Sequence, residues 1–234
     1  MLHGIDVDIP AGSFVGIVGR NGSGKSTLLS LLLRFYTAQQ GRITVDGQAL
    51  ASVPDAAFRD AVGLVPQEPY LMSASVRDNI AMGRPGISDE DVEDAAKAAR
   101  AHDFILALPQ GYETKLGEGG ARVSTGQKQL LAMARALAGA PRILFLDEAT
   151  SHIDSATEQL VGQALTALHG RVTVVAIAHR LSTIRAADQI LVLNHGQLQE
   201  RGRHEELMAR DGGLYRRLVE LQTLEEVEGD PEGP

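Results

Sequence analysis

The sequence predicts an α/β fold built on a mostly parallel sheet. Five short apolar runs, each typical of a strand buried on both faces, alternate along the chain with helical patterns. These runs cover residues 13–18, 62–65, 142–146, 172–178 and 189–193. The turn Asp46-Gly47, between the short segments 43–45 and 48–50, predicts an antiparallel β subdomain beside this core. The stretch 67–139 is expected to be a mostly helical insertion.

Three helices have clear start signals. The segment 88–101 opens with a serine, places acidic residues in its first turn and continues in alanine. The segment 124–138 opens with Ser124 and carries Gln127 three residues later, which is the pattern of a capping box. A third helix, over 25–35, is expected after the glycine-rich segment that follows the first strand.

The composition sets limits on function. The 234 residues include 22 Lys and Arg against 30 Asp and Glu, a formal net charge of −8. This acidic balance argues against a nucleic-acid partner, because binding to phosphates needs a basic face. The sequence has no cysteine, which excludes a disulfide framework, a thiolate nucleophile and a zinc site that uses sulfur. No apolar run approaches the ~20 residues of a membrane-spanning helix, so a membrane role would need a separate partner or segment.

A glycine-rich segment carries the strongest signal for chemistry. The run Gly19-Arg20-Asn21-Gly22-Ser23-Gly24-Lys25-Ser26 matches the phosphate-binding loop pattern G-x-x-x-x-G-K-[ST], between a predicted strand and a predicted helix. Its glycines let backbone N–H groups turn toward a polyphosphate, and the helix N-terminus favours negative charge. Lys25 is expected to pair with the β and γ phosphates of a nucleotide, and Ser26 to hold Mg²⁺. The alternative is a glycine-rich turn without a ligand.

Two carboxylates follow the third predicted strand. Asp147 and Glu148 lie where the carboxyl edge of an open α/β sheet binds ligands. Asp147 is the natural partner of Mg²⁺, and Glu148 is placed to orient and polarise an attacking water. Solvated acids at a strand end are the alternative, which the nearby phosphate-binding loop makes less favourable.

The order of these motifs resembles the nucleotide-binding domain of an ATP-binding cassette (ABC) transporter, over essentially the whole chain. The segment 124–127 resembles the family signature LSGGQ. The resemblance implies a P-loop NTPase core of the RecA-like type, with ATP and Mg²⁺ as cofactors. It also implies a dimer in which two such domains sandwich two ATP molecules, each signature meeting the γ-phosphate held by the opposite loop. Anion binding at a helix N-terminus makes that arrangement reasonable.

Three further residues match the family one at a time. Gln67 resembles the Q-loop glutamine that senses Mg²⁺ and couples to the membrane domain. Asp154, in the segment 151–154, resembles the acid of the D-loop, and His179 resembles the switch histidine that contacts the γ-phosphate. Each has a structural alternative: an exposed loop amide, a helix N-cap and a strand-end histidine, respectively.

The resemblance thus implies a complete set of site residues. The catalytic residues are Glu148, His179 and Lys25. The nucleotide-binding residues are Gly19, Arg20, Asn21, Gly22, Ser23, Gly24, Lys25, Ser26, Thr27, Gln67 and Asp154, with Ser124, Gly126 and Gln127 acting in trans. The Mg²⁺ ligands are Ser26, Gln67 and Asp147.

Two segments point to the exporter subfamily. Residues 111–119 resemble the segment that precedes the signature in exporters, where an acid near Glu118 lies close to the intracellular loops of the transmembrane partner. Residues 66–80 also resemble exporters. A solvated surface loop is the alternative for both. The expected location is the cytoplasmic side of the inner membrane, as a soluble domain of a transporter.

Two features depart from the family pattern. Thr125 stands where the signature usually has glycine, so a Cβ and a hydroxyl are added where backbone must approach phosphate closely. One degenerate site resembles heterodimeric exporters, and a homodimer that tolerates the substitution is the alternative. Only 18 residues precede Gly19, so the family's adenine-stacking aromatic is expected to lie in a longer polypeptide. Losing it would cost about 1–3 kcal/mol by analogy with base stacking.

The sequence therefore predicts a nucleotide-binding domain over residues 1–222, with a core of 1–66 and 140–222, a helical subdomain of 67–139, and a disordered acidic tail of 223–234. The predicted function is ATP binding and hydrolysis that power an exporter through a transmembrane domain and a second nucleotide-binding domain. The alternatives are an ATP-gated dimerisation switch with negligible hydrolysis, a soluble ABC ATPase outside transport, and a small-molecule kinase.

Overall fold

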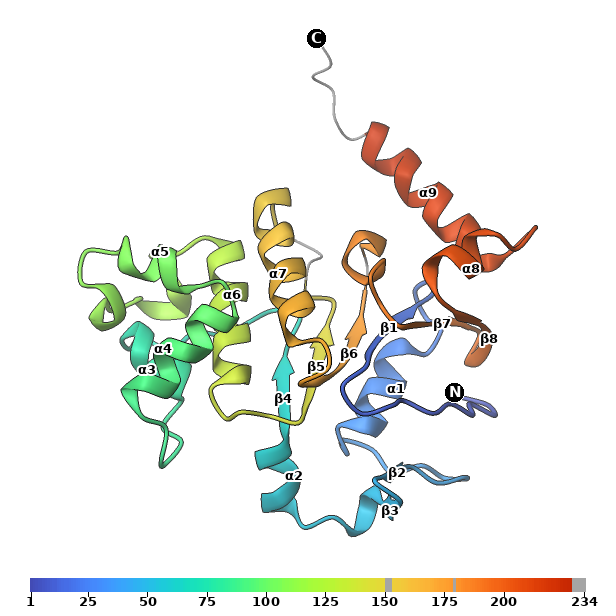
Figure 1. Cartoon of the computed structure of the whole chain (residues 1–234), viewed down its shortest axis with the longest axis horizontal. Coiled ribbons are helices and arrows are strands. Elements are labelled where there is room, and N and C mark those ends of the chain that lie inside the picture. Colours follow the sequence, from blue (N-terminus) through green and yellow to red (C-terminus); the bar gives the residue numbers. More distant parts are fainter. Residues whose placement is uncertain (150–152, 179, 229–234) are drawn as a thin grey trace.

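The fold is organised around a six-stranded sheet with the strand order β4-β5-β6-β1-β7-β8 (Figure 1). The computed structural model describes residues 1–149, 153–178 and 180–228, with side chains to residue 224. The strands are β1 (Phe14–Val18), β4 (Val62–Val65), β5 (Ile143–Asp147), β6 (Thr173–Ile177), β7 (Gln189–Asn194) and β8 (Gln197–Gly202). All neighbours pair in parallel except β7 and β8. The predicted, mostly parallel α/β sheet is confirmed.

Burial explains which strands the sequence revealed. Every residue of β1 is buried, and β6 and β7 are nearly so, which gives the continuous apolar runs of a covered parallel sheet. Strand β8 was not predicted, because at the edge of the sheet it alternates exposed and half-buried positions over the polar sequence QLQERG. A polar edge strand is a common protection against pairing with other chains.

The small antiparallel sheet is also confirmed. It consists of β2 (Thr44–Val45) and β3 (Gln48–Ala49). Asp46 and Gly47 both have positive φ angles, 49° and 78°. This is the requirement of a two-residue type I′ hairpin, which Asp-Gly satisfies at little steric cost. The 3-10 turn Leu50–Ser52 and helix α2 (Asp55–Ala61) then lead the chain back to β4.

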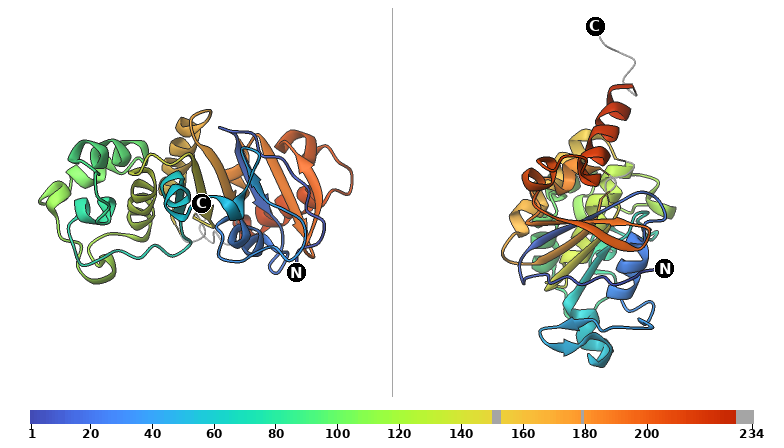
Figure 2. Two further views of the ribbon diagram at one scale, coloured as in Figure 1. Left: turned by 90° about the horizontal axis from the view of Figure 1, so that it is seen from below. Right: turned by 90° about the vertical axis from the view of Figure 1, so that its right-hand side faces the viewer.

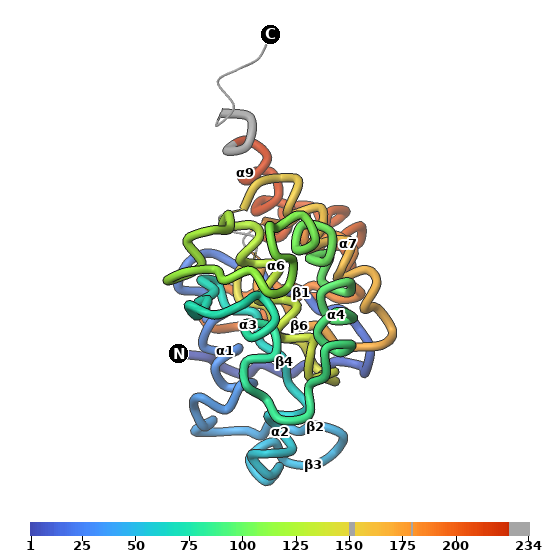
Figure 3. Tube along the Cα trace, turned by 90° about the vertical axis from the view of Figure 1, so that its left-hand side faces the viewer, coloured from blue at the N-terminus to red at the C-terminus, as the bar shows by residue number. Residues whose placement is uncertain are grey.

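A group of helices lies beside the β4 edge of the sheet (Figures 2 and 3). Its members are α3 (Val76–Ala81), α4 (Asp89–Ala98), α5 (His102–Leu106) and α6 (Thr125–Leu137), with 3-10 turns at Gly111–Glu113 and Glu118–Gly120. All fall within the predicted insertion of 67–139, although the division into subdomains stays a prediction. Helix α6 packs directly on β4: a Cβ on Gly63 would lie 2.7 Å from the carbonyl oxygen of Ala136.

The predicted helix starts are accurate, and two of the predicted ends are too late. Helix α4 begins after its Ser88 cap but ends at Ala98, and Arg100 then has a positive φ of 59°. Helix α1 (Lys25–Leu32) ends three residues before the predicted position, because Arg34 has a positive φ of 62°. Left-handed residues at non-glycine positions are uncommon, so a sequence pattern gives little warning of such stops.

The C-terminal third adds α7 (Ser155–Leu168), a 3-10 turn (Leu181–Ile184), α8 (His204–Met208) and α9 (Leu214–Glu228). Helix α9 projects from the body of the molecule (Figure 1). It continues six residues beyond the predicted boundary at 222, so disorder from 223 is a wrong prediction up to Glu228. Leucine and glutamate have high helix propensity, which favours this continuation of the helix. Residues 229–234 lie outside the described part. No helix in that part is long and apolar enough to cross a bilayer.

Candidate functional site

The sheet brings the phosphate-binding loop and the two carboxylates to one edge. Ile17 of β1 and Asp147 of β5 are both in register with Ile177 of the strand between them. Because neighbouring strands lie about 4.8 Å apart, the Cα atoms of Ile17 and Asp147 are separated by roughly 10 Å. Gly19 and Glu148 continue from these strands. The predicted juxtaposition of the loop and the acids is therefore present in the fold.

The loop has the backbone that its glycines were expected to supply. Gly19, Gly22 and Gly24 have φ angles of 151°, 76° and 106°. Gly24 caps helix α1, whose first residue is Lys25. A Cβ on Gly19 would lie 2.6 Å from the hydroxyl of Ser23. That hydroxyl is buried and has no hydrogen-bond partner among the described residues. The loop therefore holds a free hydrogen-bonding group, which an oxygen of a bound polyphosphate would satisfy.

Lys25 is folded into this loop. Its Nζ atom donates hydrogen bonds to the carbonyl oxygens of Gly19 (2.7 Å) and Arg20 (3.3 Å), and the residue is only 7% exposed. Burial lowers the pKa of the Lys25 ammonium, while Glu148 and then Asp147 oppose that shift. The loop thus holds a partly desolvated cation beside two carboxylates, an arrangement suited to an anion accompanied by a metal ion.

The two carboxylates sit at a sharp turn after β5. Glu148 has a positive φ of 46°, and its N–H donates to the carbonyl oxygen of Ile177 (3.0 Å). Such a conformation in a bulky residue is uncommon and frequently marks a functional site. Both side chains are half-buried. Burial first, and Glu148 second, raise the pKa of Asp147 above its ordinary value, against the opposing effect of Lys25.

The raised pKa of Asp147 gives a prediction about stability. A carboxyl group whose pKa is higher in the folded state stabilises the fold below its ordinary pKa, and that contribution is lost as the pH rises through the folded-state value. At pH 7 the ionised Asp147 therefore opposes folding of the nucleotide-free chain. We expect Asp147→Asn to raise the thermal unfolding midpoint at pH 7, with the difference shrinking toward pH 4.

Scanning calorimetry at both pH values, with and without Mg-ATP, measures this effect. Asp147→Asn should also lose much of the stabilisation that Mg-ATP gives the parent chain. Asp60→Asn, at an exposed position on α2, is the matched control and should change neither quantity. A lower midpoint for Asp147→Asn at pH 7 would contradict the electrostatic argument.

The residues present fit Mg²⁺ bound together with a nucleotide. No cluster of three or more His, Cys, Asp or Glu side chains that could hold a metal occurs among the described residues. Mg²⁺ does not need such a cluster, because it is often held by one or two protein ligands, phosphate oxygens and water. Ser26, exposed in the first turn of α1, and the half-buried Asp147 supply a ligand set of that kind. Gln67, the third predicted ligand, is exposed after β4.

The signature segment forms the start of α6 as predicted. Ser124 is the N-cap: its Oγ accepts from the N–H of Gln127 (3.2 Å), and the side-chain oxygen of Gln127 accepts from the N–H of Ser124 (3.0 Å). Thr125 occupies the first helical position and is exposed. The substitution of threonine for glycine therefore leaves the helix start intact.

Asp154 acts as the N-cap of α7, the structural role that the sequence left open. Its carboxylate accepts from the N–H (2.9 Å) and the hydroxyl (2.8 Å) of Thr157. These hydrogen bonds lower the pKa of Asp154. The predicted His179, and residues 151 and 152 of the predicted D-loop, lie outside the described residues.

Two polar residues that the sequence did not single out organise the segment after Gln67. Buried Asn79 accepts from the N–H of Met72 (2.8 Å) and donates to its carbonyl oxygen (3.0 Å). Arg135 of α6 donates to the carbonyl oxygens of Asn79 and Tyr70, both at 2.8 Å. The only sequence signal was a lone arginine on an otherwise apolar stretch of helix. These bonds tie the segment after Gln67 to the signature helix.

The two segments that resemble exporters lie side by side. Ser75 and Lys115 form an isolated antiparallel bridge. The N–H of Val76 donates to the carbonyl oxygen of Thr114 (3.0 Å), and the N–H of Leu116 donates to that of Ala74 (3.0 Å). Glu118, predicted to approach a transmembrane partner, is exposed just beyond this pairing.

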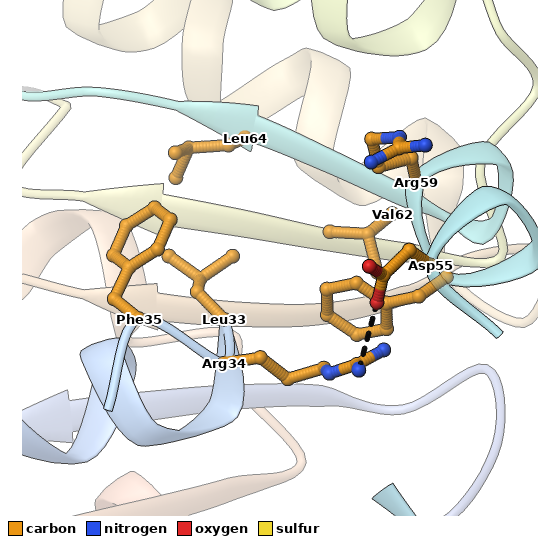
Figure 4. A pocket seen from close by; sticks show the side chains of 8 residues that line it. Leu33, Arg34, Phe35, Asp55, Arg59, Val62 and Leu64 are labelled. Carbon is orange, nitrogen blue, oxygen red and sulfur yellow. Dashed lines mark hydrogen bonds and ion pairs between the residues drawn. The ribbon is translucent and has the colours of Figure 1, made fainter. Parts of the chain in front are cut away.

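An open pocket of about 360 Å³ lies between the end of α1, helix α2 and the outer face of β4 (Figure 4). Its lining combines five apolar side chains with three charged ones: Leu33, Phe35, Phe58, Val62 and Leu64, and Arg34, Asp55 and Arg59. The side chain of Arg34 extends along the pocket, and its guanidinium forms an ion pair with Asp55 (2.9 Å). The same guanidinium lies over the Phe58 ring, 5.1 Å from the ring centre. The next residues, Phe35 and Tyr36, are 65% and 67% exposed. Exposed aromatic side chains beside an open apolar face are typical of an interaction surface.

Comparisons with known proteins agree with the motifs. A family model described as ABC transporter matches residues 2–151. The chain is 47% identical to the ATM1-type heavy metal exporter of Novosphingobium aromaticivorans over 228 residues, 97% of this chain and 37% of that protein. It is also 47% identical to the cyclolysin secretion/processing ATP-binding protein CyaB of Bordetella pertussis over 224 residues, 96% of this chain and 31% of that protein.

A solved structure supports the same likeness. A bacterial Atm1-family ABC exporter with ATP bound superposes with a TM-score of 0.87 at 48% identity, covering 94% of this chain and 38% of that one. The chain therefore spans less than two fifths of the length of each of these three proteins.

Proposed function

Because this chain belongs to the ABC transporter family, as an ATP-binding domain, we propose that it hydrolyses ATP to power an exporter. The observation that carries the proposal is the meeting of the Lys25 loop and the Asp147-Glu148 turn at one edge of the sheet. A phosphate-binding loop alone would suit a kinase. The additional signature helix and the similarity to exporters over nearly the whole chain favour transport-coupled hydrolysis.

The residues of the site divide the work of phosphoryl transfer to water. The N–H groups of the loop, with Lys25, bind the β and γ phosphates. Ser26 with Asp147 would hold Mg²⁺, and a bound Mg²⁺ would supply positive charge against the negative charge of the phosphates. Glu148 accepts a proton from the attacking water and orients it in line with the leaving oxygen. Gln67 and His179 are assigned to the metal and the γ-phosphate on the family resemblance.

The site is completed by a second copy or a related domain. Ser124, Gly126 and Gln127 at the N-terminus of α6 offer N–H groups and a positive helix end to the γ-phosphate of the partner. In the free chain the N–H groups and the side chains of Ser124 and Gln127 are all engaged in the capping box, so their contact with a nucleotide requires that these bonds be exchanged. Asp154 is exposed at the start of α7, and we assign it to the same interface on the family resemblance.

The membrane partner is proposed to dock at the aromatic pocket, the opening lined by Leu33, Phe58, Val62 and Leu64. Val62 and Leu64 are only half-buried there, while their neighbours Gly63 and Val65 are buried on the α6 side. A segment of a transmembrane domain would cover this open face together with Phe35 and Tyr36. The protein would then act on the cytoplasmic side of the inner membrane, beside the export path of that domain.

A concentration series tests the proposed function. We expect Mg-ATP turnover of the 234-residue chain to rise more steeply than linearly with protein concentration, because two chains complete each site. Turnover per chain should level off once dimers predominate. Phosphate release is measured at saturating Mg-ATP, and dimer formation is followed by light scattering in the same samples.

The other outcomes are equally informative. Turnover strictly proportional to protein concentration, in samples that light scattering shows to be monomeric, would contradict assembly of the site from two chains. ATP-dependent dimers without phosphate release would support an ATP-gated dimerisation switch instead. This is the second candidate function, and the threonine at position 125 of the signature is the observation that favours it.

A further inference from the structure

A buried contact joins the signature helix to helix α7 within one chain. Thr157, in the first turn of α7, is only 9% exposed. Its side chain faces Gly126 of α6: a Cβ on Gly126 would lie 2.9 Å from both Cβ and Cγ2 of Thr157, and closer still to its Oγ1. Real Cβ atoms do not approach other atoms so closely, so the two helices touch here without room for one methyl group.

The backbone of Gly126 does not itself require glycine. The residue lies within α6, away from the left-handed region that only glycine adopts freely. Glycine is unfavourable inside a helix compared with alanine. The structure offers a reason for keeping it that lies in the same chain, namely the side chain of Thr157.

Thr157 is held firmly by its own turn. Its N–H and its hydroxyl both donate to Asp154, at 2.9 and 2.8 Å. The position of the Thr157 side chain is therefore fixed by the cap of α7, and through Gly126 it fixes the N-terminus of α6.

The next residue connects the same turn to a third segment. The carboxylate of Glu158 accepts a hydrogen bond from Arg180 on one oxygen and from the hydroxyl of Ser182 on the other. The Glu158 side chain is 14% exposed. Arg180 directly follows position 179, so the first turn of α7 contacts both the signature helix and the chain that follows the predicted switch position.

We propose that Thr157 is a positioning residue for ATP turnover, setting the signature helix relative to Asp154, and that position 126 is glycine because of Thr157 in cis. This inference rests on the proposed function. The signature acts on the partner's nucleotide, whereas the β5–α7 connection carries Glu148 of the chain's own site. If the signature helix and the β5–α7 connection are rigidly linked by this contact, both composite sites would close simultaneously rather than one after the other.

A double-variant cycle in the full chain tests the proposal. We expect Gly126→Ala to lower kcat at least about tenfold, since small misplacements in an assembled site cost up to about 10²-fold. The affinity of the dilute chain for ATP should not change, because its own phosphate-binding loop is untouched. Thr157→Ala removes Oγ1, the nearest atom, and Cγ2, but keeps the Cβ that also lies at 2.9 Å, so it should restore part of the lost kcat in the Gly126→Ala background. Thr157→Ser keeps the hydroxyl and should behave almost as the parent chain.

The alternative is that glycine serves only the approach of the partner's phosphate. In that case the double variant would remain as inactive as Gly126→Ala, and the proposal would be overturned. Thermal unfolding of the nucleotide-free variants separates packing from function: Thr157→Ala should also recover part of the fall in midpoint that Gly126→Ala causes. Restored stability without restored turnover would reduce Thr157 to a structural role.

Failure of the proposed function itself has a different signature. It would appear as absent phosphate release in the parent chain, whatever residue stands at 126. The unfolding cycle would then still decide whether Thr157 imposes glycine at position 126.

Discussion

Replacing Glu148 by glutamine should nearly abolish ATP turnover while leaving ATP binding intact. Glutamine keeps the size and the hydrogen-bonding reach of the side chain, but it cannot accept the proton of the attacking water. General-base catalysis contributes about 10²–10⁴-fold to such reactions, and we expect a loss of kcat in that range. Steady-state phosphate release at saturating Mg-ATP gives kcat, and equilibrium binding of a fluorescent ATP analogue gives the affinity.

The variant also separates binding from opening of the dimer. If hydrolysis reopens the assembled pair, Glu148→Gln should accumulate as a dimer in Mg-ATP, visible by size-exclusion chromatography. Glu113→Gln, an exposed acid in the 3-10 turn Gly111–Glu113, is the matched control and should match the parent chain in both assays. Turnover of Glu148→Gln within threefold of the parent would remove Glu148 from its assigned role.

The sequence predicted the parts of the fold whose causes are local. The covered strands appeared as apolar runs, the hairpin as Asp46-Gly47, and the start of α6 as Ser124 with Gln127. These features depend on burial, turn geometry and capping, each of which a short segment specifies by itself. Strand β8 depends instead on its place at the edge of the sheet. The early end of α1 depends on the left-handed conformation of Arg34, which the neighbouring residues do not predict.

The candidate site also has a part that the sequence predicts and a part that it does not. Lys25 and Ser26 can be predicted from the motif alone, because the phosphate-binding loop is continuous in sequence. The contact between Gly126 and Thr157 joins residues from two helices. The bonds of Arg135 to Tyr70 and Asn79 join residues 65 and 56 positions apart in the sequence. Such contacts are fixed by tertiary packing, so they were not predictable from spacing. They are also the contacts that hold the pieces of the site in register.

Removing the charge of Lys25 is the other change with a large expected effect. The ammonium is bonded to the carbonyl oxygens of Gly19 and Arg20, and burial has already lowered its pKa. Part of its solvation has therefore been given up before any ligand arrives. A phosphate oxygen placed there gains a charge-assisted hydrogen bond at little reorganisation cost.

We therefore expect Lys25→Met to weaken Mg-ATP binding about 10- to 100-fold, since hydrogen bonds to charged groups contribute roughly 1.5–3 kcal/mol. The unfolding midpoint without nucleotide should change little, because the loss of two hydrogen bonds is offset by removal of a partly desolvated charge. The rise in midpoint on adding Mg-ATP, which reports the ratio of ligand concentration to Kd, should fall sharply. Lys97→Met, at an exposed lysine of α4, should retain that rise. A Lys25→Met chain that Mg-ATP stabilises as much as the parent would show that the phosphates bind elsewhere, and the site at this edge of the sheet would have to be abandoned.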